Sequence, residues 1–181
     1  MELSQSHFQS PGYYIREAAT PWEARGVADL RQRVFVEEQA IFRGHDRDEI
    51  DLIATHLAAL STYAHEADCV VGTVRIHEAA PGLWWGSRLA VDREFRQIGR
   101  LGAELIRLAV RTAQTRGCHT FLAHVQKQNE PLFRRLHWKS LEEITLHGVV
   151  HVRMQVDLAK YPPLADPAAG WYHPVRRGIA Q

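Results

Sequence analysis

The feature that most constrains the fold is a short apolar strand that runs into a glycine-rich, cationic turn and then into an amphipathic helix. The strand ends at Leu89-Ala90-Val91-Asp92, and the turn reads Arg96-Gln97-Ile98-Gly99-Arg100-Leu101-Gly102. Such a turn directs several backbone N–H groups and the positive end of a helix at one place. The stretch therefore predicts a site for a phosphate or pyrophosphate group, although a plain strand–turn–helix connection would also explain its glycines.

Two well-known phosphate-binding turns do not fit this pattern. A P-loop requires Gly-x-x-x-x-Gly-Lys-Ser/Thr, and no lysine stands at the required position. A dinucleotide-binding turn requires Gly-x-Gly-x-x-Gly in a βαβ unit near the start of its domain, which this turn is not. The ligand is therefore expected from another class of phosphate-bearing molecules.

Composition is typical of a soluble globular protein. The 181 residues carry a formal net charge of +1, with 45% apolar and 24% charged side chains, which gives no bulk attraction to nucleic acid or membranes. There is no run of about 18 apolar residues and no signal peptide. Cys69 and Cys118 have no paired spacing and are expected as reduced thiols. These features predict a cytoplasmic protein that binds neither nucleic acid nor membrane.

Local patterns predict strands and helices in alternation. Thr20-Pro21-Trp22-Glu23 has the residues of a capping box with proline in the first turn, so a helix is expected from there to about Glu38. Gly72 inside an apolar run suggests a bulge or a close backbone neighbour. Strands are expected at 13–16, 55–61, 69–77, 83–91, 119–126, 141–146 and 149–158, a helix after the turn, and a short helix capped by Asn129.

This order predicts one mixed sheet with helices packed against it. We expect a flexible N-terminal segment at 1–12, one domain at 13–160, and a proline-rich extended arm at 161–181. The arm, with Trp171 and Tyr172, could brace a homodimer or fold over the site.

The segment from Leu89 to Gly99 resembles the acetyl-CoA-binding signature of the GNAT N-acetyltransferase superfamily, Arg/Gln-x-x-Gly-x-Gly/Ala after a strand that ends in Leu-x-Val. Arg96 and Gly99 match, whereas Leu101 stands where glycine or alanine is usual and Gly102 follows one position later. Asn129 with 131–138 resembles the family's Asn…Phe-Tyr-x-x-Leu-Gly-Phe segment, and 151–154 its last strand. The resemblance covers about residues 13–158 and is greatest to acetyltransferases of bacterial nitrilase gene clusters.

The resemblance implies an α/β (α+β) fold with a mixed, mostly antiparallel sheet of six to seven strands flanked by helices. It implies acetyl-CoA as co-substrate, direct attack of an amine on the thioester, and no metal. The Val91 N–H would stabilise the thioester oxygen as it gains charge. The residues expected to hold the coenzyme are Leu89, Ala90, Val91, Arg96, Gln97, Ile98, Gly99, Arg100, Leu101, Gly102, Asn129 and Phe133.

Deprotonation of the amine is the harder part of the chemistry. An amine with a pKa of about 10.4 requires roughly 4 kcal/mol to lose its proton at neutral pH, so a general base is expected. The tyrosine that commonly protonates the thiolate in the family is replaced here by Phe133. The candidate catalytic groups are Glu38, Asp48, His124 and His151, although the pattern favours a core or turn position for each histidine over a catalytic one.

A second resemblance concerns the N-terminal half. Residues 30–39 and the pattern Asp46-x-Asp48-x-x-Asp51 resemble acyl-homoserine-lactone synthases, GNAT-like enzymes in which the matching groups line the acceptor side. The residues expected by this resemblance, or by position, to contact the acceptor are Arg31, Asp46, Asp51, Arg75 and Trp85. The alternative for the three aspartates is a solvated acidic loop; an EF-hand does not fit, because Ile50 and Asp51 fall where a ligand and the glycine belong.

Three hypotheses follow. The first is an acetyl-CoA-dependent N-acetyltransferase acting on a small-molecule amine. The second is an acyl-homoserine-lactone-type synthase, and the third is a non-catalytic acyl-CoA-binding protein, suggested by Phe133. The eleven histidines show no His-Glu-x-x-His spacing, so no metal site is expected.

Overall fold

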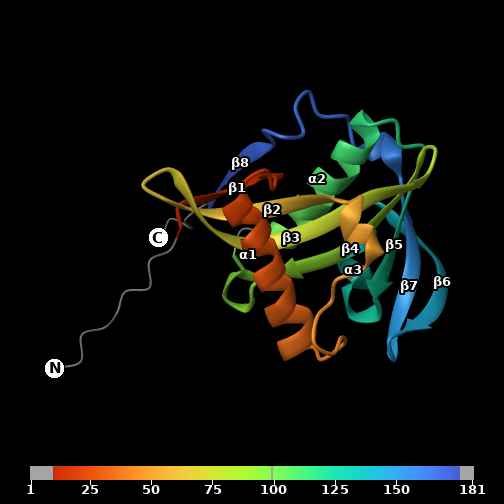
Figure 1. Cartoon of the computed structure of the whole chain (residues 1–181). Coiled ribbons are helices and arrows are strands. Elements are labelled where there is room, and N and C mark those ends of the chain that lie inside the picture. Colours follow the sequence, from red (N-terminus) through yellow and green to blue (C-terminus); the bar gives the residue numbers. More distant parts are fainter. Residues whose placement is uncertain (1–9, 99, 176–181) are drawn as a thin grey trace, which may run out of the picture.

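An eight-stranded sheet forms the centre of the molecule (Figure 1). The computed structural model describes residues 10–98 and 100–175; the predicted Gly99 and most of the predicted N-terminal segment lie outside the described residues. The strand order is β6-β7-β5-β4-β3-β2-β1-β8. The strands are β1 (Gly12–Glu17), β2 (Thr55–Tyr63), β3 (Glu66–Ala80), β4 (Leu83–Val91), β5 (Thr120–Gln126), β6 (Trp138–Leu146), β7 (Val149–Val156) and β8 (Trp171–Pro174).

Every neighbouring pair in the sheet is antiparallel except β4 and β5, which are parallel. The prediction of a mixed, mostly antiparallel sheet is therefore confirmed, with eight strands instead of six to seven. The additional strand is β8, which pairs with β1. Its four residues are too few to show an alternating pattern, so the sequence predicted only an extended arm there.

The segment before β8 packs along α2 (Leu101–Thr115). Arg111 donates to the Pro162 carbonyl at 2.8 Å, and Thr115 donates to the Leu164 carbonyl at 3.0 Å. Gly170 then adopts a φ of +56°, and a Cβ there would lie 1.9 Å from the Ile15 carbonyl oxygen. Only glycine allows this approach to β1. The described part of the arm thus covers α2.

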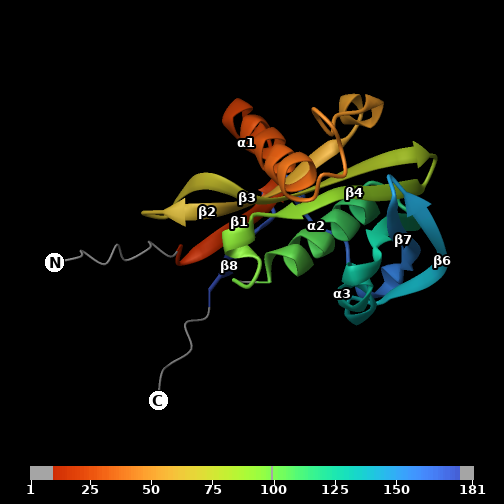
Figure 2. The ribbon, with the colours of Figure 1, turned by 90° about the horizontal axis from the view of Figure 1, so that it is seen from below.

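Helices cover both faces of the sheet (Figure 2). α1 (Pro21–Arg31) and the π-helical turn η1 (Gln32–Glu38) lie on one face, and α2 and α3 (Glu130–Arg135) lie on the other. The capping box of Thr20 and Glu23 is present, which confirms the predicted helix start. Short 3₁₀ turns complete the chain: η2 (Glu49–Leu52), η3 (Arg93–Phe95), η4 (Lys127–Asn129) and η5 (Leu158–Lys160).

Two apolar cores result from this layering. The larger core lies between the sheet and α2, where Leu101, Leu105 and Leu108 are almost completely buried. The smaller core lies between the sheet and α1, around Val27 and Leu30. Among the described residues, no helix has both the length and the apolar character needed to cross a membrane.

Two irregularities shape the middle of the sheet. At Gly72 the register of β2 and β3 shifts, which confirms the suggested bulge. A Cβ there would lie 2.9 Å from the Leu105 side chain and 3.2 Å from the Ala59 Cβ, so the close neighbours of this glycine are side chains and not backbone. In β4 the register against β3 shifts at Arg88, whose φ is +55°. A side chain other than glycine rarely adopts this conformation, so the chain holds Arg88 there through tertiary contacts.

Candidate active site

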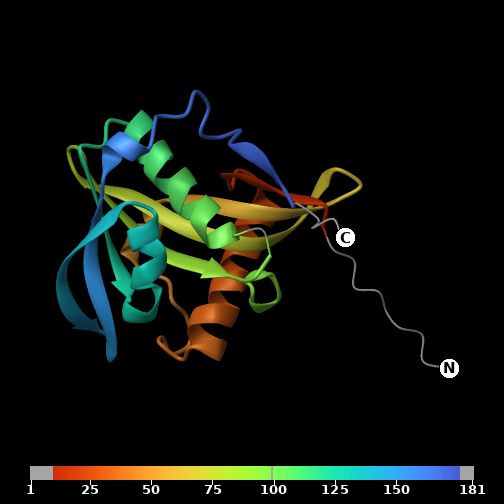
Figure 3. The same ribbon diagram turned by 180° about the vertical axis from the view of Figure 1, so that it is seen from behind.

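The site begins where β4 separates from β5. The two strands pair only from Leu83 to Gly86 on β4 and from Thr120 to Ala123 on β5. The rest of β4 continues beside β3 alone. Figure 3, the view from behind, shows α2 in front of the sheet with its first turn beside the end of β4. The separated strands and the helix start therefore enclose one region.

The backbone at the end of β4 has a free edge in this region. The Asp92 N–H donates to the Val71 carbonyl of β3 at 2.8 Å. Successive N–H groups along a strand point to opposite edges. The Val91 N–H therefore points away from β3, toward the edge from which β5 has departed.

The start of α2 presents its own N–H groups. Arg100 occupies the N-cap position in the left-handed conformation, with a φ of +54°, and no side chain caps the helix. The first N–H groups of a helix lack intrahelical partners and carry partial positive charge. Gly102 lies in this first turn, and a Cβ there would make ordinary contacts of 3.9 Å with Val91 and 4.0 Å with Leu132. The turn is thus open and close to β4.

A cavity of ≈ 690 Å³, here called the α2–α3 cavity, lies between these elements. Seven of the residues predicted to hold a coenzyme line it: Leu89, Ala90, Val91, Arg96, Arg100, Gly102 and Asn129. Eight lining residues were not predicted: Val34, Gln39, Ala103, Arg107, Gln128, Leu132, Arg135 and Leu136. The cavity is therefore built from both the glycine-rich turn and α3.

Other predicted coenzyme residues lie outside the walls of this cavity. Leu101 is 1% exposed, so its side chain points into the core, and Ile98 packs against the same core. Gln97 is exposed at the surface. The departure from the usual glycine or alanine at Leu101 consequently places no side chain in the cavity.

Arg96 is held by Glu38 and by β4. Its guanidinium donates to both Glu38 carboxylate oxygens at 2.5 and 2.7 Å and to the Val91 carbonyl at 3.0 Å. The hydrogen bonds from Arg96 lower the pKa of Glu38 below its ordinary value. Glu38 is thus an ionised partner of Arg96. It does not line the cavity between β4 and β5, described below, where a base for an acceptor would have to lie.

A smaller cavity of ≈ 280 Å³ adjoins the α2–α3 cavity and shares Arg107, Arg135 and Leu136 with it. Arg111 and Lys160 also line it, together with His137. No carboxylate is among the described residues of its lining. This cationic cavity is suited to a phosphate group at the end of the larger one.

A cavity of ≈ 450 Å³, here called the splay cavity, occupies the gap between β4 and β5. It shares Leu89 and Asn129 with the α2–α3 cavity. Six other predicted site residues line it: Asp48, Arg75, Trp85, His124, Phe133 and His151. The two cavities therefore meet at the end of β4, beside the free edge of Val91.

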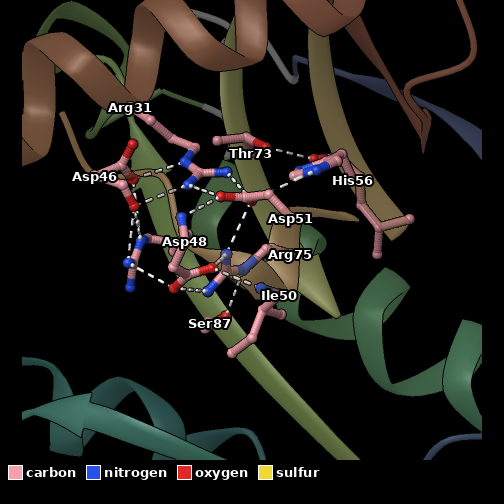
Figure 4. A network of polar contacts seen from close by, with 11 residues as sticks. Arg31, Asp46, Asp48, Ile50, Asp51, His56, Thr73, Arg75 and Ser87 are labelled. Atoms are coloured by element: carbon pink, nitrogen blue, oxygen red, sulfur yellow. Dashed lines mark hydrogen bonds and ion pairs between the residues drawn. The ribbon is translucent and has the colours of Figure 1, made fainter. Parts of the chain in front are cut away.

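A network of three arginines and three aspartates stands beside the splay cavity (Figure 4). Arg31 contacts Asp46 and Asp51, each at 2.7 Å. Arg75 contacts Asp48 at 2.5 Å and Asp51 at 2.9 Å. The structure thus brings together these five predicted residues from α1, β3, η2 and the loop between η1 and η2.

The network is not a solvated acidic loop. Arg75 is 1% exposed and Asp46 is 4% exposed. Burial alone would raise the pKa of Asp51, but hydrogen bonds from Arg31, the Asp48 backbone and Arg75 outweigh it and lower that pKa. The pKa of Asp48 is lowered against burial in the same way by Arg75 and Arg88. Asp48 and Asp51 are therefore ionised partners of arginine, and Asp46 contacts Arg31 at 2.7 Å and Arg88 at 3.0 Å.

The third arginine of the network, Arg88, was not predicted. Its guanidinium contacts Asp46 at 3.0 Å and Asp48 at 3.1 Å and lies 4.4 Å from the Phe42 ring centre. The left-handed backbone at the bulge accompanies this placement. No local sequence signal marks such a bulge, because arginine is not a residue that favours positive φ.

Four histidines line the splay cavity: His77, His124, His147 and His151. His124 lies with its ring centre 4.7 Å from that of Trp85. Burial, followed by repulsion from His151 and Arg153, lowers the pKa of His124. His77, which the sequence did not suggest, has a buried Nδ1 without a hydrogen-bond partner among the described residues. Burial and Arg75 lower the pKa of His77, so both rings favour the neutral, proton-accepting form.

Phe133 and Asn129 have different surroundings. The Phe133 ring is buried and packs edge-on against Trp138, with ring centres 5.1 Å apart. Asn129 stands at the N-cap position of α3, but its side chain makes no capping hydrogen bond, so the predicted cap is wrong. Its amide instead lines both cavities.

The described residues were compared with the requirements of a metal site. They contain no group of three or more histidine, cysteine, aspartate or glutamate side chains placed to hold a metal ion. Cys69 and Cys118 are both free thiols, and burial raises the pKa of Cys118 to about 11.

Several solved structures share the fold of this chain. ElaA of Escherichia coli is 18% identical, with a TM-score of 0.66 over 80% of this chain and 98% of that chain. An acyl-CoA N-acyltransferase from Pseudomonas aeruginosa is 20% identical, with a TM-score of 0.66 over 80% and 98%. The acyl-homoserine lactone synthase BjaI, solved with SAM and isopentyl-CoA, is 20% identical, with a TM-score of 0.61 over 81% and 84%.

A search of curated protein sequences gives no match. The model of the acetyltransferase (GNAT) family, in contrast, matches residues 22–138, which is more than half of the chain. The splayed β4, the open start of α2 and the cavity between α2 and α3 lie mainly within or beside this span. The chain therefore belongs to the GNAT acetyltransferase family.

Proposed function

We propose that the protein is an acyltransferase that moves an acetyl group from acetyl-CoA to the amine of a small molecule, by direct attack on the thioester. The observation that carries this proposal is the meeting of the α2–α3 cavity and the splay cavity at Leu89 and Asn129. One cavity is suited to a phosphate-bearing thioester and the other to an acceptor. The reacting atoms would meet where the two cavities join.

The coenzyme would be held by groups that the fold leaves available. The N–H groups at the start of α2 and the guanidinium of Arg100 would bind the diphosphate. Arg107 and Arg135, shared with the cationic cavity, would bind phosphate oxygens further along. The pantetheine would lie along the free edge of β4, with the Val91 N–H donating to the thioester oxygen as charge develops on it.

The acceptor amine would enter the splay cavity. All three carboxylates of the network are bound by arginine, so the amine would meet no carboxylate that lacks a cationic partner. The network would then act as a rigid wall, with Asp48 at its open side. His124, whose pKa is lowered by burial, or His151 would accept the amine proton, directly or through water. Phe133 cannot protonate the thiolate, so that proton would come from one of these histidines or from solvent.

Two other functions remain as proposals. The Arg–Asp network and the fold shared with BjaI support an acyl-homoserine-lactone-type synthase. The replacement of tyrosine by Phe133 supports a non-catalytic acyl-CoA-binding protein. A location in the cytoplasm, membership of the nitrilase-cluster subgroup and a homodimer also stay predictions.

A thiol-release assay distinguishes these functions. Purified protein with acetyl-CoA and a broad panel of amines should release thiol above background with at least one amine. Thiol release that requires S-adenosylmethionine as the acyl acceptor would support the lactone synthase. Tight acetyl-CoA binding without release for any amine would support the binding protein, and absence of acetyl-CoA binding would contradict acetyl transfer.

A further inference from the structure

The splay cavity has two limbs, one on each face of the sheet. The outer limb faces α1 and the loop after η1, and its walls include Phe42, Asp48 and Arg75. The inner limb faces α2, and its walls include Ile106 and Ala109 of that helix. α1 and α2 cover opposite faces of the sheet (Figure 2). One cavity lined from both faces therefore passes through the sheet between β4 and β5.

The passage opens where strand pairing ends. Gly86 and Ala123 form the last pair of β4 with β5, and both line the cavity. Gly86 contributes no side chain, and a Cβ there would lie 3.0 Å from the Phe121 ring. The two smallest residue types thus flank the opening, and the ring of Phe121 packs against bare backbone beside it.

The two limbs differ in chemistry. Strand alternation places Phe121, Ala123 and Val125 toward the inner limb and His124 toward the outer limb. The inner limb has apolar walls, each side chain less than a tenth exposed: Val74, Ile106, Ala109, Phe121, Phe133 and Trp138. The titratable and charged groups of the cavity belong to the outer limb. An amine that must lose a proton is therefore suited to the outer limb only.

We propose that the inner limb binds the hydrocarbon chain of an acyl group longer than acetyl, so that the preferred donors are medium-chain acyl-CoA thioesters. This inference rests on the acyl transfer of the proposed function, because it requires the thioester to lie at the junction of Leu89 and Asn129, and it replaces acetyl-CoA by longer thioesters as the preferred donors. From that junction a two-carbon group would leave the inner limb empty. The whole splay cavity measures ≈ 450 Å³, which is in the size range of small-molecule sites, and the inner limb is the part of it that the acyl chain would fill.

The same walls exclude a charged chain. A carboxylate carried into the inner limb would lose its hydration and find no hydrogen-bond donor on these six side chains other than the Trp138 indole N–H. Thioesters of dicarboxylic acids should therefore bind less well than simple fatty thioesters of equal length.

Binding of thioesters tests the proposal without any knowledge of the acceptor. Calorimetric titration of the full-length protein with acetyl-, butyryl-, pentanoyl-, hexanoyl- and octanoyl-CoA should show affinity rising by up to about fourfold per buried methylene until the limb is filled. Glutaryl-CoA, which has the length of pentanoyl-CoA and a terminal carboxylate, should bind less tightly than pentanoyl-CoA. Equal affinity for all these thioesters would overturn the proposal, whereas no binding of any of them would contradict the proposed function itself.

Variants on α2 identify the limb. Ala109→Leu should lower the ratio of hexanoyl-CoA to acetyl-CoA affinity by filling the limb, and Ile106→Ala should move the optimum to a longer chain. Leu108→Ala, a matched buried residue of the same helix outside the cavity, should leave this ratio unchanged. If Ala109→Leu does not fold, the chain-length optimum of Ile106→Ala tests the proposal by itself. A constant ratio in the folded variants, or a changed amine preference in its place, would overturn the proposal.

Discussion

The guanidinium of Arg75 lies 2.5 Å from the Asp48 carboxylate, although Arg75 comes from the middle of a strand and Asp48 from a loop on the α1 side of the sheet. Arg75 is 1% exposed and also contacts Asp51 at 2.9 Å and donates to Ser87 at 3.0 Å. It thus joins the acidic loop, β3 and β4 on one wall of the splay cavity. This wall depends on ion pairs in which Arg75 is buried, whereas the Asp48 side chain remains 37% exposed.

Arg75→Gln should therefore be strongly destabilising. Removal of one partner leaves Asp48 and Asp51 partly uncompensated, and the free energy of unfolding should fall by about 3 kcal/mol. Urea denaturation followed by tryptophan fluorescence measures the change. Arg47→Gln, an exposed arginine in the same loop, should change it by less than about 0.5 kcal/mol. Equal losses in the free energy of unfolding for the two substitutions would show that the ion pairs of Arg75 do not stabilise the fold.

The same network predicts a loss of stability in acid. The pKa values of Asp48 and Asp51 are lowered in the folded protein, so between these values and the ordinary value of about 3.9 the unfolded chain binds more protons. The contribution of these carboxylates is complete above about pH 4 and is lost as pH falls through the folded-state pKa values.

Urea denaturation at several pH values measures this effect. Asp51→Asn should be less stable than the parent at neutral pH, and the difference should shrink as pH falls below about 4. Asp68→Asn, an exposed carboxylate outside the network, should follow the parent curve. A difference between Asp51→Asn and the parent that stays constant down to acid would contradict the assignment of the lowered pKa.

Gly102→Glu should weaken coenzyme binding while the fold is kept. An acidic side chain in the first turn of a helix favours the helix, whereas its charge repels a diphosphate about 4 Å away by about 1–4 kcal/mol. Calorimetric titration with acetyl-CoA should show at least about a tenfold weaker affinity. Gly102→Ala should bind nearly as the parent does, because its Cβ makes only ordinary contacts. Unchanged binding by Gly102→Glu would place the diphosphate elsewhere.

Arg135 and its neighbour Arg134 offer a matched pair. Arg135 lines both the α2–α3 cavity and the cationic cavity, whereas Arg134 pairs with Glu130 at 2.9 Å and lines neither. Arg135→Gln should weaken acetyl-CoA binding by about tenfold through loss of a charge-assisted contact. Arg134→Gln should have little effect on the same titration. The reverse order would show that the coenzyme does not pass α3 on this side.

Local rules of the sequence predict much of the fold. The capping box of Thr20 and Glu23 is present, β4 has the predicted bounds, and the open turn before α2 lies where glycines were expected. These features depend on neighbouring residues, which a sequence shows directly. β8 was missed because its pairing depends on β1, far along the chain.

Local sequence patterns predict less of the candidate site than of the fold. The expected gathering of Arg31, Asp46, Asp48, Asp51 and Arg75 is present, but the resemblance to other enzymes suggested it, not the spacing. Arg88 and His77 could not be predicted, since their positions depend on a bulge and on strand register. The orientation of Leu101 into the core likewise follows from how α2 docks on the sheet.

A CoA thioester and an acceptor are proposed to meet at the end of β4, and a crystal structure of the protein with bound CoA would show whether they do. The diphosphate is expected at the first turn of α2, and the sulfur is expected between Leu89 and Asn129, facing the Val91 N–H. A sulfur atom located away from this junction, or a diphosphate away from Gly102, would show that the thioester binds elsewhere.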